Sequence, residues 1–352
     1  MEQQVNRKKK SVCILFGGRS AEHDVSILSA TAVFRNLDRA RFTPQLVYIS
    51  REGLWRPVNE HEMATPTAGS LSRGLFQPML PWLCGGTPLI RADICFPVLH
   101  GPNGEDGRIP ALLELAGMPF VGAGSLGSAL AMDKGTAKIL FHAAGIETPD
   151  FLVFTRNRIK EIRRNVTERL DWPVFVKPCN LGSSVGITKV KAPAELEAAV
   201  DLAFRHDSRI IVEQGIQGRE IEVAVMGNNH LEVSQPGELI PHNDFYDYAD
   251  KYIDGKTTFS IPANLDRNRS EKIRDLAARA FQSLYLFGLS RVDFFLEEPG
   301  GRILVNEINT MPGFTEISMF PKLFLLEDYT FQSLVTRLID YGLARQTDGS
   351  SR

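Results

Sequence analysis

Short apolar runs alternate with longer stretches of helical periodicity from residue 11 to about residue 125. The longer stretches cover 25–37 and 109–116, and the short runs end in glycine or polar residues. The strand-like runs are "VCILFGG", "TPQLVYIS", "ADICFPVLHG" and "MPFVG". Strands that alternate with helices predict an open, mostly parallel sheet of the Rossmann-like α/β type.

The pattern changes from about residue 126. One helix is expected through "SALAMDKGTAKILFHAAG", ended by Gly145 with Pro149 beyond it. A helical stretch, "AELEAAVDLAF", then lies among three strand-like runs, which are "PVFVKP", "GITKV" and "RIIVEQ". These elements predict a small α+β unit.

From residue 217 onward, the two strand-like runs "EIEVAVMG" and "HLEVSQPGELI" lead into 241–262, which has no clear periodicity. A helix over 269–286, two further strands and a terminal helix complete the chain. We therefore expect three domains. They are an N-terminal open α/β domain over 1–125, a small central domain over 126–216 and a larger C-terminal α+β domain over 217–352.

The charge balance narrows the class of partner. Lys and Arg total 40 against 42 Asp and Glu, so a net charge of -2 gives no broad basic surface for nucleic acid or an anionic membrane. The basic start passes into "SVCILF" rather than a signal peptide, and no apolar run reaches membrane-span length. The four cysteines lack C-x-x-C spacing, which indicates reduced thiols. We expect a cytoplasmic protein without membrane insertion.

An acid and an amide, Glu307 and Asn309, lie two residues apart in the apolar run "ILVNEIN". Together with the preceding run "SRVDFFLE" and the "PGG" between them, this run predicts an antiparallel hairpin. A turn centred on Gly300 places Asp293 opposite Glu307 and Arg291 opposite Asn309. All four side chains then share one face, because side chains two apart along a strand point the same way.

Two carboxylates and an amide oxygen on one face are hard ligands suited to Mg²⁺ or Mn²⁺. Facing carboxylates repel each other unless one is protonated or a cation lies between them. The same pattern also fits an exposed polar face with loosely paired charges, and a one-residue slip of the turn would separate the residues. Phosphate oxygens would complete the ligand shell of the metal, so this hypothesis needs a phosphate-binding element elsewhere in the chain.

The loop "NLGSSVG", residues 180–186, joins two expected strands, so its backbone N–H groups could close over phosphate oxygens. Lys177 precedes this loop and Lys134 lies on the earlier helix, which supplies two positive charges for a polyphosphate. Glu213 and Glu220 flank a turn at which adenine or ribose contacts would fit. Taken alone, the loop also fits a flexible turn, and the acids fit an exposed surface.

A second glycine pattern, "GAGSLG" over 122–127, satisfies G-x-G-x-x-G and opens a helix. Only "MPFV" precedes it, and no strand ending in an acid follows the helix. A dinucleotide site requires both features, so this reading is not favoured.

Two loops of the first segment contain candidate substrate residues. In "LFGGRSAEHDVS" a strand runs into two glycines, and Ser20 is expected to cap a helix whose first turn contains Glu22 and Asp24. This helix end could hold a substrate carboxylate, although acids there also stabilise the helix dipole. The loop "VLHGPNGEDG" places His100 at the carboxyl end of a strand, where open α/β sheets bind ligands, but a structural histidine fits too.

Eight motifs resemble, in order and spacing, those of the D-alanine-D-alanine ligases of the ATP-grasp superfamily, over residues 11–345. They are "GGRSAEHDVS", "FPVLHGPNGEDG", "MDK", "VKPCNLGSSVG", "VEQGIQGREIEVAV", "FYDYADKY", "SRVDFFL" and "VNEINTMPGFTEISMFPKL". The resemblance implies a Rossmann-like N-terminal domain followed by an ATP-grasp fold, made of a small central and a larger C-terminal α+β domain. ATP would bind between the last two.

The resemblance also implies which residues bind the nucleotide and the metal ions. Two lysines would contact the phosphates under the serine-containing loop, with further contacts at adenine and ribose. The implied ATP contacts are Lys134, Lys177, Ser183, Ser184, Glu213, Ile216, Glu220 and Lys251. The implied ligands of two Mg²⁺ or Mn²⁺ ions are Asp293, Glu307 and Asn309.

The resemblance assigns the substrate contacts as well. Glu22 would orient the ammonium of the first D-alanine and form a hydrogen-bonded triad with Ser183 and Tyr252 that closes the site. Arg291 and the Gly313 amide would stabilise the tetrahedral oxyanion. The remaining implied substrate contacts are His100, Ser318, Met319 and Lys322.

The implied reaction joins two D-alanine molecules for peptidoglycan precursor synthesis. One substrate carboxylate attacks the γ-phosphate of ATP to give an acyl phosphate, and the amine of the second substrate then attacks the acyl carbon. An acyl phosphate hydrolyses easily, so water must be excluded, and 241–262 is expected to form a closing lid. The resemblance further implies a homodimer.

Three other functions are weighed against this one. Tyr252 matches the dipeptide-forming ligases, whereas relatives that make D-alanyl-D-lactate carry a histidine in this loop, and His242 lies outside the matching motif. A nicotinamide-dependent dehydrogenase would have to bind NADH. A non-catalytic nucleotide-binding protein would bind ATP without turning it over.

Overall fold

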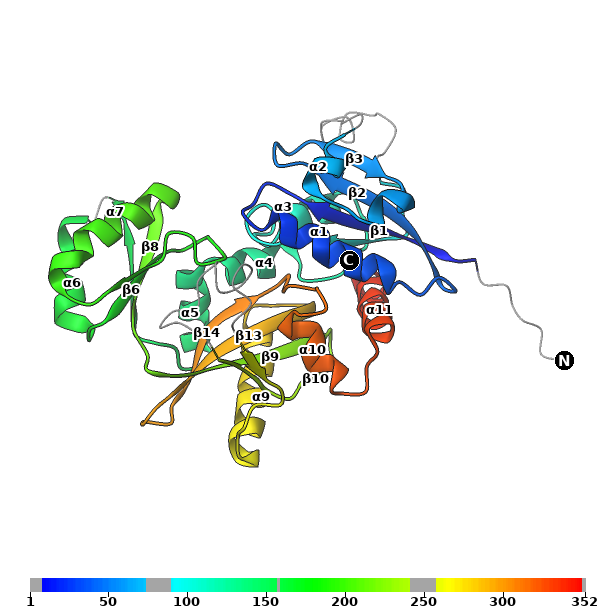
Figure 1. Cartoon of the computed structure of the whole chain (residues 1–352). Helices are drawn as coiled ribbons and strands as arrows, with labels where there is room; N and C mark the ends of the chain where they lie inside the picture. Colours follow the sequence, from blue (N-terminus) through cyan, green and yellow to red (C-terminus); the bar gives the residue numbers. More distant parts are fainter. Residues whose placement is uncertain (1–7, 74–89, 157–158, 241–257, 350–352) are drawn as a thin grey trace.

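The chain forms three β-sheets with helices packed around them (Figure 1), and the computed structural model describes residues 8–73, 90–156, 159–240 and 258–349. The α/β and α+β class expected from the sequence is confirmed. No helix in these described ranges is long and apolar enough to cross a membrane.

The first sheet has the strand order β3-β2-β1-β4. Its strands are β1 (Lys10–Gly17), β2 (Phe42–Ile49), β3 (Trp55–Val58) and β4 (Ile94–Val98), with helices α1 (His23–Arg35) and α3 (Arg108–Leu115). β1 runs parallel to both β2 and β4, as the alternation of strands and helices predicts, and only β3 is antiparallel. The expected strand at "MPFVG" is wrong, because this segment makes a single bridge from Phe120 to Cys95.

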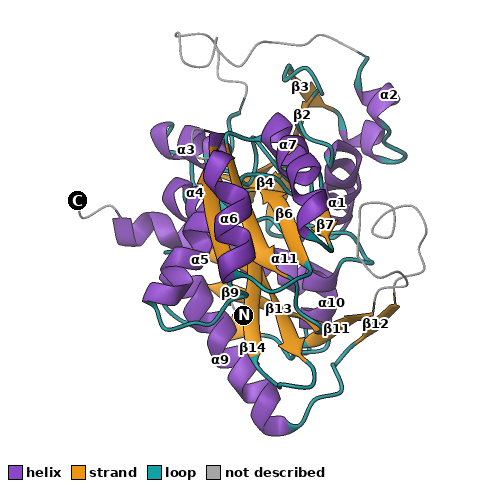
Figure 2. Ribbon diagram, turned by 90° about the vertical axis from the view of Figure 1, so that its left-hand side faces the viewer, coloured by secondary structure: helices purple, strands orange, loops and turns teal. Residues whose placement is uncertain are grey.

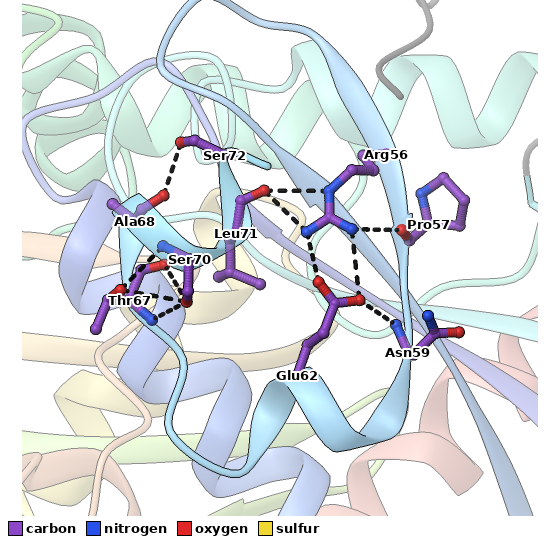
Figure 3. A network of polar contacts seen from close by, with 9 residues as sticks. All are labelled: Arg56, Pro57, Asn59, Glu62, Thr67, Ala68, Ser70, Leu71 and Ser72. Carbon is purple, nitrogen blue, oxygen red and sulfur yellow. Dashed lines mark hydrogen bonds and ion pairs between the residues drawn. The ribbon is translucent and has the colours of Figure 1, made fainter. Parts of the chain in front are cut away.

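A buried arginine holds the chain that leaves β3. Arg56 pairs with Glu62 in the short helix η1 (Glu60–Met63), with 2.9 Å between Nη2 and Oε1. Its Nε also donates to the carbonyl oxygen of Leu71 in α2 (Ala68–Leu71) at 3.1 Å (Figure 3). One side chain therefore ties two short helices to the edge of the first sheet.

The central sheet is entirely antiparallel in the order β5-β8-β6-β7. Its elements are β5 (Phe151–Thr155), α6 (Ile159–Arg169), β6 (Val174–Pro178), β7 (Thr188–Val190), η4 (Pro193–Glu195), α7 (Leu196–His206) and β8 (Arg209–Gln214). α6 and α7 lie beside this sheet at one end of the molecule (Figure 1), and the unit has a hydrophobic core of its own. The sequence reading missed β5.

The third sheet has the order β12-β11-β9-β13-β14, with β10 paired to β9. Its strands are β9 (Gly218–Gly227), β10 (Leu231–Val233), β11 (Gly237–Ile240), β12 (Thr258–Ser260), β13 (Gly288–Glu297) and β14 (Ile303–Asn309). The run "HLEVSQPGELI", expected as one strand, is divided between β10 and β11. Helices α9 (Arg267–Ser283) and α10 (Met319–Leu325) flank this sheet (Figure 2).

The first and third sheets share one hydrophobic core. It combines Ile14 and Phe96 of the first sheet with Phe320 of α10 and Leu338 of the terminal helix α11 (Phe331–Gly349). Figure 1 shows α11 beneath α1, next to the first sheet. The two ends of the chain are thus packed together, and this packing positions the first sheet against the third.

The single helix expected over 128–145 is wrong. The chain instead forms α4 (Ser125–Met132) and α5 (Lys134–Ala143), separated at Asp133, whose φ of -80° and ψ of 97° are extended. The Asp133 carboxylate accepts the N–H of Thr136 at 2.8 Å and caps α5. The break places Lys134 at the first position of a new helix.

Replacing Arg56 by methionine is expected to lower the free energy of unfolding by about 2 kcal/mol, because buried carbonyl and carboxylate acceptors lose charged hydrogen-bond donors. Chemical denaturation measures this loss. Arg267→Met is the control, since Arg267 and its partner Glu271 are 90% and 56% exposed and we expect little change there. Equal effects of both substitutions would contradict this role for Arg56.

Candidate active site

The β13–β14 hairpin brings the expected four residues together. Arg291 lies opposite Asn309, and Asp293 lies opposite Glu307, which confirms the predicted pairs. The assumption of a regular hairpin centred on Gly300 is nevertheless wrong. Nearer the turn Phe294 pairs with Val305, and a β-bulge then shifts the register by one residue before Asp293.

Each hairpin carboxylate has a cation beside it. The guanidinium of Arg291 donates to both oxygens of Asp293, at 2.6 and 2.7 Å, and Asn309 Nδ2 donates to Asp293 Oδ2 at 2.9 Å. Lys134 Nζ lies 3.3 Å from Glu307 Oε2. The two facing acids therefore coexist without an unbalanced repulsion.

A second charge cluster is formed by Glu213 of β8, Lys177 of β6 and Lys138 of α5. Glu213 is 3% exposed, with Lys177 Nζ 2.5 Å from its Oε2 and Lys138 Nζ 3.3 Å from its Oε1. Burial opposes ionisation of Glu213, but Lys138 and Lys177 lower its pKa overall. The sequence reading missed Lys138, although it lies one helical turn after Lys134 and therefore on the same side of α5.

The loop over 180–186 joins these clusters to the first sheet. Lys134 Nζ donates to the carbonyl oxygen of Leu181 at 2.8 Å. A Cβ placed on Gly182 would lie 3.3 Å from Glu22 Oε2, so the loop backbone closely approaches that carboxylate. Ser183 and Ser184 have left-handed φ values of 51° and 59°, which marks strained backbone for residues other than glycine.

Of the expected triad, the structure describes Glu22 and Ser183 but not Tyr252. Ser183 Oγ is buried and has no hydrogen-bond partner among the described residues. Tyr252 and Lys251 lie outside the described residues, as does most of the expected lid over 241–262. The triad of Glu22, Ser183 and Tyr252 stays a prediction.

The start of α1 differs from the expectation. Glu22, not Ser20, is the N-cap residue, and its side chain makes no capping hydrogen bond. Ser20 Oγ instead accepts the N–H of Glu22 at 3.1 Å and donates to the carbonyl oxygen of His100 at 2.8 Å. The predicted cap at Ser20 is wrong, and its hydroxyl ties the Glu22 turn to the loop after β4.

Glu105, in that same loop, was not singled out from the sequence. It is 9% exposed and lies near Glu22, and its two oxygens accept the N–H groups of Gly101 at 2.7 Å and Met311 at 3.1 Å. His100 has both ring nitrogens engaged, by the Met311 carbonyl oxygen and by Ser29 Oγ. A substrate contact through His100 stays a prediction.

The residues expected to receive the second substrate follow β14. A Cβ on Gly313 would lie 2.8 Å from Ser318 Oγ, so the two positions adjoin. Ser318 Oγ accepts the N–H of Thr315 at 3.0 Å, and Met319 is buried. Lys322 Nζ lies 4.7 Å from the centre of the Phe259 ring.

The remaining two nucleotide candidates lie around the turn between β8 and β9. Ile216 is half-buried in that turn. Glu220, on β9, pairs with Phe295 on one side and Leu239 on the other. Both stay predictions as adenine and ribose contacts.

A separate cavity of about 230 Å³ opens at the carboxyl ends of the first sheet, lined by Arg19, Trp55 and Asn103 among others. Of the candidate site residues that the structure describes, only His100 lines it. The charged groups described above lie elsewhere, so this cavity does not mark the chemistry.

Lysines, a small-residue loop and hairpin carboxylates that converge between two antiparallel α+β sheets define an enzyme of the ATP-grasp class. The observed central and third sheets, with the loop over 180–186 and the β13–β14 hairpin, supply these parts.

Comparison with known proteins specifies the family. Residues 11–123 match the family described as D-ala D-ala ligase N-terminus, and residues 140–340 match D-ala D-ala ligase C-terminus. The chain therefore belongs to the D-alanine-D-alanine ligase family.

Individual relatives agree over nearly the whole chain. A D-alanine-D-alanine ligase of Ruminiclostridium cellulolyticum is 42% identical, over 97% of each chain. The VanG D-Ala:D-Ser ligase from Enterococcus faecalis superposes with a TM-score of 0.85 at 36% identity, covering 95% of this chain and 100% of that one. The D-alanine-D-alanine ligase from Coxiella burnetii gives a TM-score of 0.87 at 34% identity, covering 98% and 97%.

Glu105 is expected to make stability depend on pH. Burial, followed by the like charges of Glu22 and Glu307, raises its pKa from 4.5 to about 8. The folded chain thus keeps a proton that the unfolded chain releases near pH 4.5. This stabilising contribution is fully present below that pH and is lost as the pH rises through about 8.

Denaturation of the wild type and of Glu105→Gln at about pH 6 and about pH 8.5 measures this contribution. We expect the wild type to lose more stability between the two pH values than the variant does. The same loss in both proteins would show that Glu105 does not titrate in this range.

Proposed function

We propose that this chain is an ATP-dependent ligase that joins two D-alanine molecules into D-alanyl-D-alanine for peptidoglycan precursor synthesis. The supporting observation is the position of the loop over 180–186. Its Leu181 carbonyl oxygen accepts from Lys134, which also pairs with Glu307, while its Gly182 backbone approaches Glu22. Glu22, expected at the first substrate, and Glu307, expected at the metal ions beside the phosphates, therefore lie on either side of this loop.

The lysines are suited to ATP phosphates because their present partners are carboxylates. Lys134 and Lys177 would exchange Glu307 and Glu213, respectively, for phosphate oxygens, while Ser183 and Ser184 cover them. Lys138 would remain beside Glu213 and balance the negative charge of its carboxylate. The remaining proposed contacts are Ile216 near adenine, Glu220 at the ribose and Lys251 from the lid.

Asp293, Glu307 and Asn309 would hold two Mg²⁺ or Mn²⁺ ions. Two carboxylates and an amide oxygen provide hard ligands, and the Asp293 and Glu307 side chains are 13% and 29% exposed, so ligands can reach them. Each carboxylate has about four lone-pair sites, so Asp293 can keep Arg291 while it binds an ion. The ions would neutralise charge on the transferring phosphoryl group.

The chain's own groups would then orient and stabilise the reacting atoms. Glu22 would hold the ammonium of the first D-alanine while its carboxylate attacks the γ-phosphate. Arg291 and the Gly313 N–H would hold the oxyanion when the second amine attacks the acyl carbon and phosphate leaves. Ser318 and Lys322 would receive the second carboxylate, beside Met319.

Closure and assembly belong to the same proposal. Tyr252 would complete the triad with Glu22 and Ser183 when the lid covers the acyl phosphate and excludes water. We place the enzyme in the cytoplasm as a homodimer that acts on small molecules and has no nucleic-acid partner.

D-serine is a second candidate for the position of the second substrate, because the similar VanG structure is that of a D-Ala:D-Ser ligase. The described residues of the second site, Ser318 and Lys322, would bind the carboxylate that both amino acids share. A D-alanine-D-lactate ligase is the remaining alternative, although Tyr252 in the motif "FYDYADKY" favours D-alanine over D-lactate as the second substrate.

Phosphate release from Mg-ATP tests the proposal directly. We expect release with D-alanine and none with L-alanine, because Glu22 and the second-site groups fix the positions of the ammonium and carboxylate. Mass spectrometry of products formed from D-alanine with D-serine or D-lactate measures the choice of second substrate. Equal turnover with L-alanine would exclude this function, and NADH binding without ATP turnover would favour a dehydrogenase.

Glu307→Gln is expected to lower kcat by about 100-fold or more, because the isosteric amide keeps the shape but removes charge from the proposed metal site. Glu297→Gln is the matched control, since Glu297 lies on the same hairpin and pairs with Arg302 at 2.6 Å, away from the site. Initial rates of phosphate release at saturating ATP and D-alanine measure both variants. Similar rates in the two would contradict the role of Glu307.

A further inference from the structure

The turn that follows β14 is held by side chains from the N-terminal region. Met311 donates its N–H to Glu105 Oε1 at 3.1 Å, and its carbonyl oxygen lies 2.8 Å from His100 Nδ1. The backbone N–H and C=O of Met311 are thus both hydrogen-bonded to the loop after β4, which lies more than 200 residues earlier in the chain.

Ser29, on α1, holds the other side of the turn. Its Oγ accepts the N–H of Phe314 at 3.1 Å and lies 2.9 Å from His100 Nε2. Burial lowers the pKa of His100, which favours the neutral ring. The Met311 carbonyl can only accept, so Nδ1 carries the proton and Nε2 accepts from the Ser29 hydroxyl.

These contacts form a closed chain of hydrogen bonds around Gly313. The three holding side chains are buried, with Ser29 0%, His100 4% and Glu105 9% exposed. Pro312 precedes Gly313 and has a fixed φ, which further limits the turn. Gly313 itself remains partly exposed between buried neighbours, so its N–H has a defined direction and access to a ligand.

The same N-terminal loop also contacts the proposed first-substrate acid. Gly101 donates its N–H to Glu105 Oε2 at 2.7 Å, and a Cβ on Gly101 would lie 2.8 Å from Glu22 Oε2. The loop therefore lies between the acid expected to orient the first substrate and the amide expected to bind the oxyanion.

We propose that Glu105, His100 and Ser29 are positioning residues that fix the Gly313 amide for the oxyanion, so that the N-terminal domain sets the geometry of a group in the C-terminal domain. This inference rests on the proposed function for the role of Gly313. Simple adhesion between the domains would also satisfy the buried polar groups of Met311 and Phe314, because buried backbone N–H and C=O groups are almost always hydrogen-bonded. Positioning is favoured because the contacts lie on both sides of Gly313. The two roles differ in their effect on kcat.

Ser29→Ala and Glu105→Gln test the proposal in the full chain. The first removes the acceptor of the Phe314 N–H, and the second places an amide NH₂ where one of two N–H donors needs an oxygen. We expect kcat to fall about 10-fold or more in each, with KM for ATP changed less than about twofold, because only the oxyanion donor is displaced. Hydrogen exchange at Met311, Gly313 and Phe314 should become faster.

Asp340→Asn is the matched control. Asp340 of α11 pairs with Arg41 at 2.7 Å, so this ion pair also joins the two ends of the chain but does not contact the turn. We expect the control to keep the wild-type kcat and the wild-type exchange at residues 311–314. A similar fall of kcat in Asp340→Asn would favour simple adhesion and overturn the positioning role.

Two further outcomes separate this inference from the proposed function. Wild-type kcat in both Ser29→Ala and Glu105→Gln, with active wild-type enzyme, would overturn the inference and leave the ligase function intact. A wild type that releases no phosphate with D-alanine would instead overturn the ligase function. If Ser29→Ala does not fold, Glu105→Gln alone decides, because its side chain has the same size as the original.

Discussion

One extra residue in β14 decides which side chains the third sheet presents to the site. Side chains alternate along a strand, so Val305 and Glu307 would ordinarily share a face. Val305 is buried in the core, and the bulge between the two residues turns Glu307 and Asn309 to the opposite side, where Asp293 lies. In a regular strand the Glu307 carboxylate would enter the core, where an unpaired charge is costly. The ion pair of Glu307 with Lys134 and the hydrogen bond from Asn309 to Asp293 therefore depend on this bulge.

Asp293, Glu307 and Glu213 each have at least one cation beside them. Arg291 accompanies Asp293, Lys134 accompanies Glu307, and two lysines accompany Glu213. A lysine that moves from a carboxylate to a phosphate oxygen leaves that carboxylate unpaired, unless another cation stays beside it. The second lysine beside Glu213 makes this exchange feasible in a buried place, where a lone carboxylate would be strongly destabilised.

Much of the fold and of the hairpin site could be predicted from the sequence. The alternation of strands and helices identified the parallel first sheet, and counting residues across the hairpin paired Asp293 with Glu307. That count succeeded because two departures from a regular hairpin cancelled: the turn is not centred on Gly300, and the bulge at Asn306 shifts the register back by one residue. Nothing in the local sequence indicates either departure. The break at Asp133 was missed because the apolar periodicity continues through it, while the cap depends on a single carboxylate.

Residues whose importance depends on distant partners were harder to find. Lys138 and Glu105 lie in segments that were recognised, but their roles arise from Glu213 and Met311, which are far away in the sequence. Serine is a residue type that is preferred at helix N-caps. The hydroxyl of Ser20 nevertheless donates to the carbonyl oxygen of His100, in another loop. The sequence pattern predicts local helices and strands. Contacts between distant segments cannot be predicted from it, because they form only when the chain packs.

The shared core of the first and third sheets has a consequence for biosynthesis. The cluster that contains Ile14 and Phe96 also needs Phe320 and Leu338 from the last tenth of the chain. A ribosome that has released only the N-terminal strands leaves that cluster unfinished and its apolar face in water. The first sheet to be synthesised is thus among the last parts to complete its packing, so the nascent chain must avoid aggregation until almost every residue has emerged.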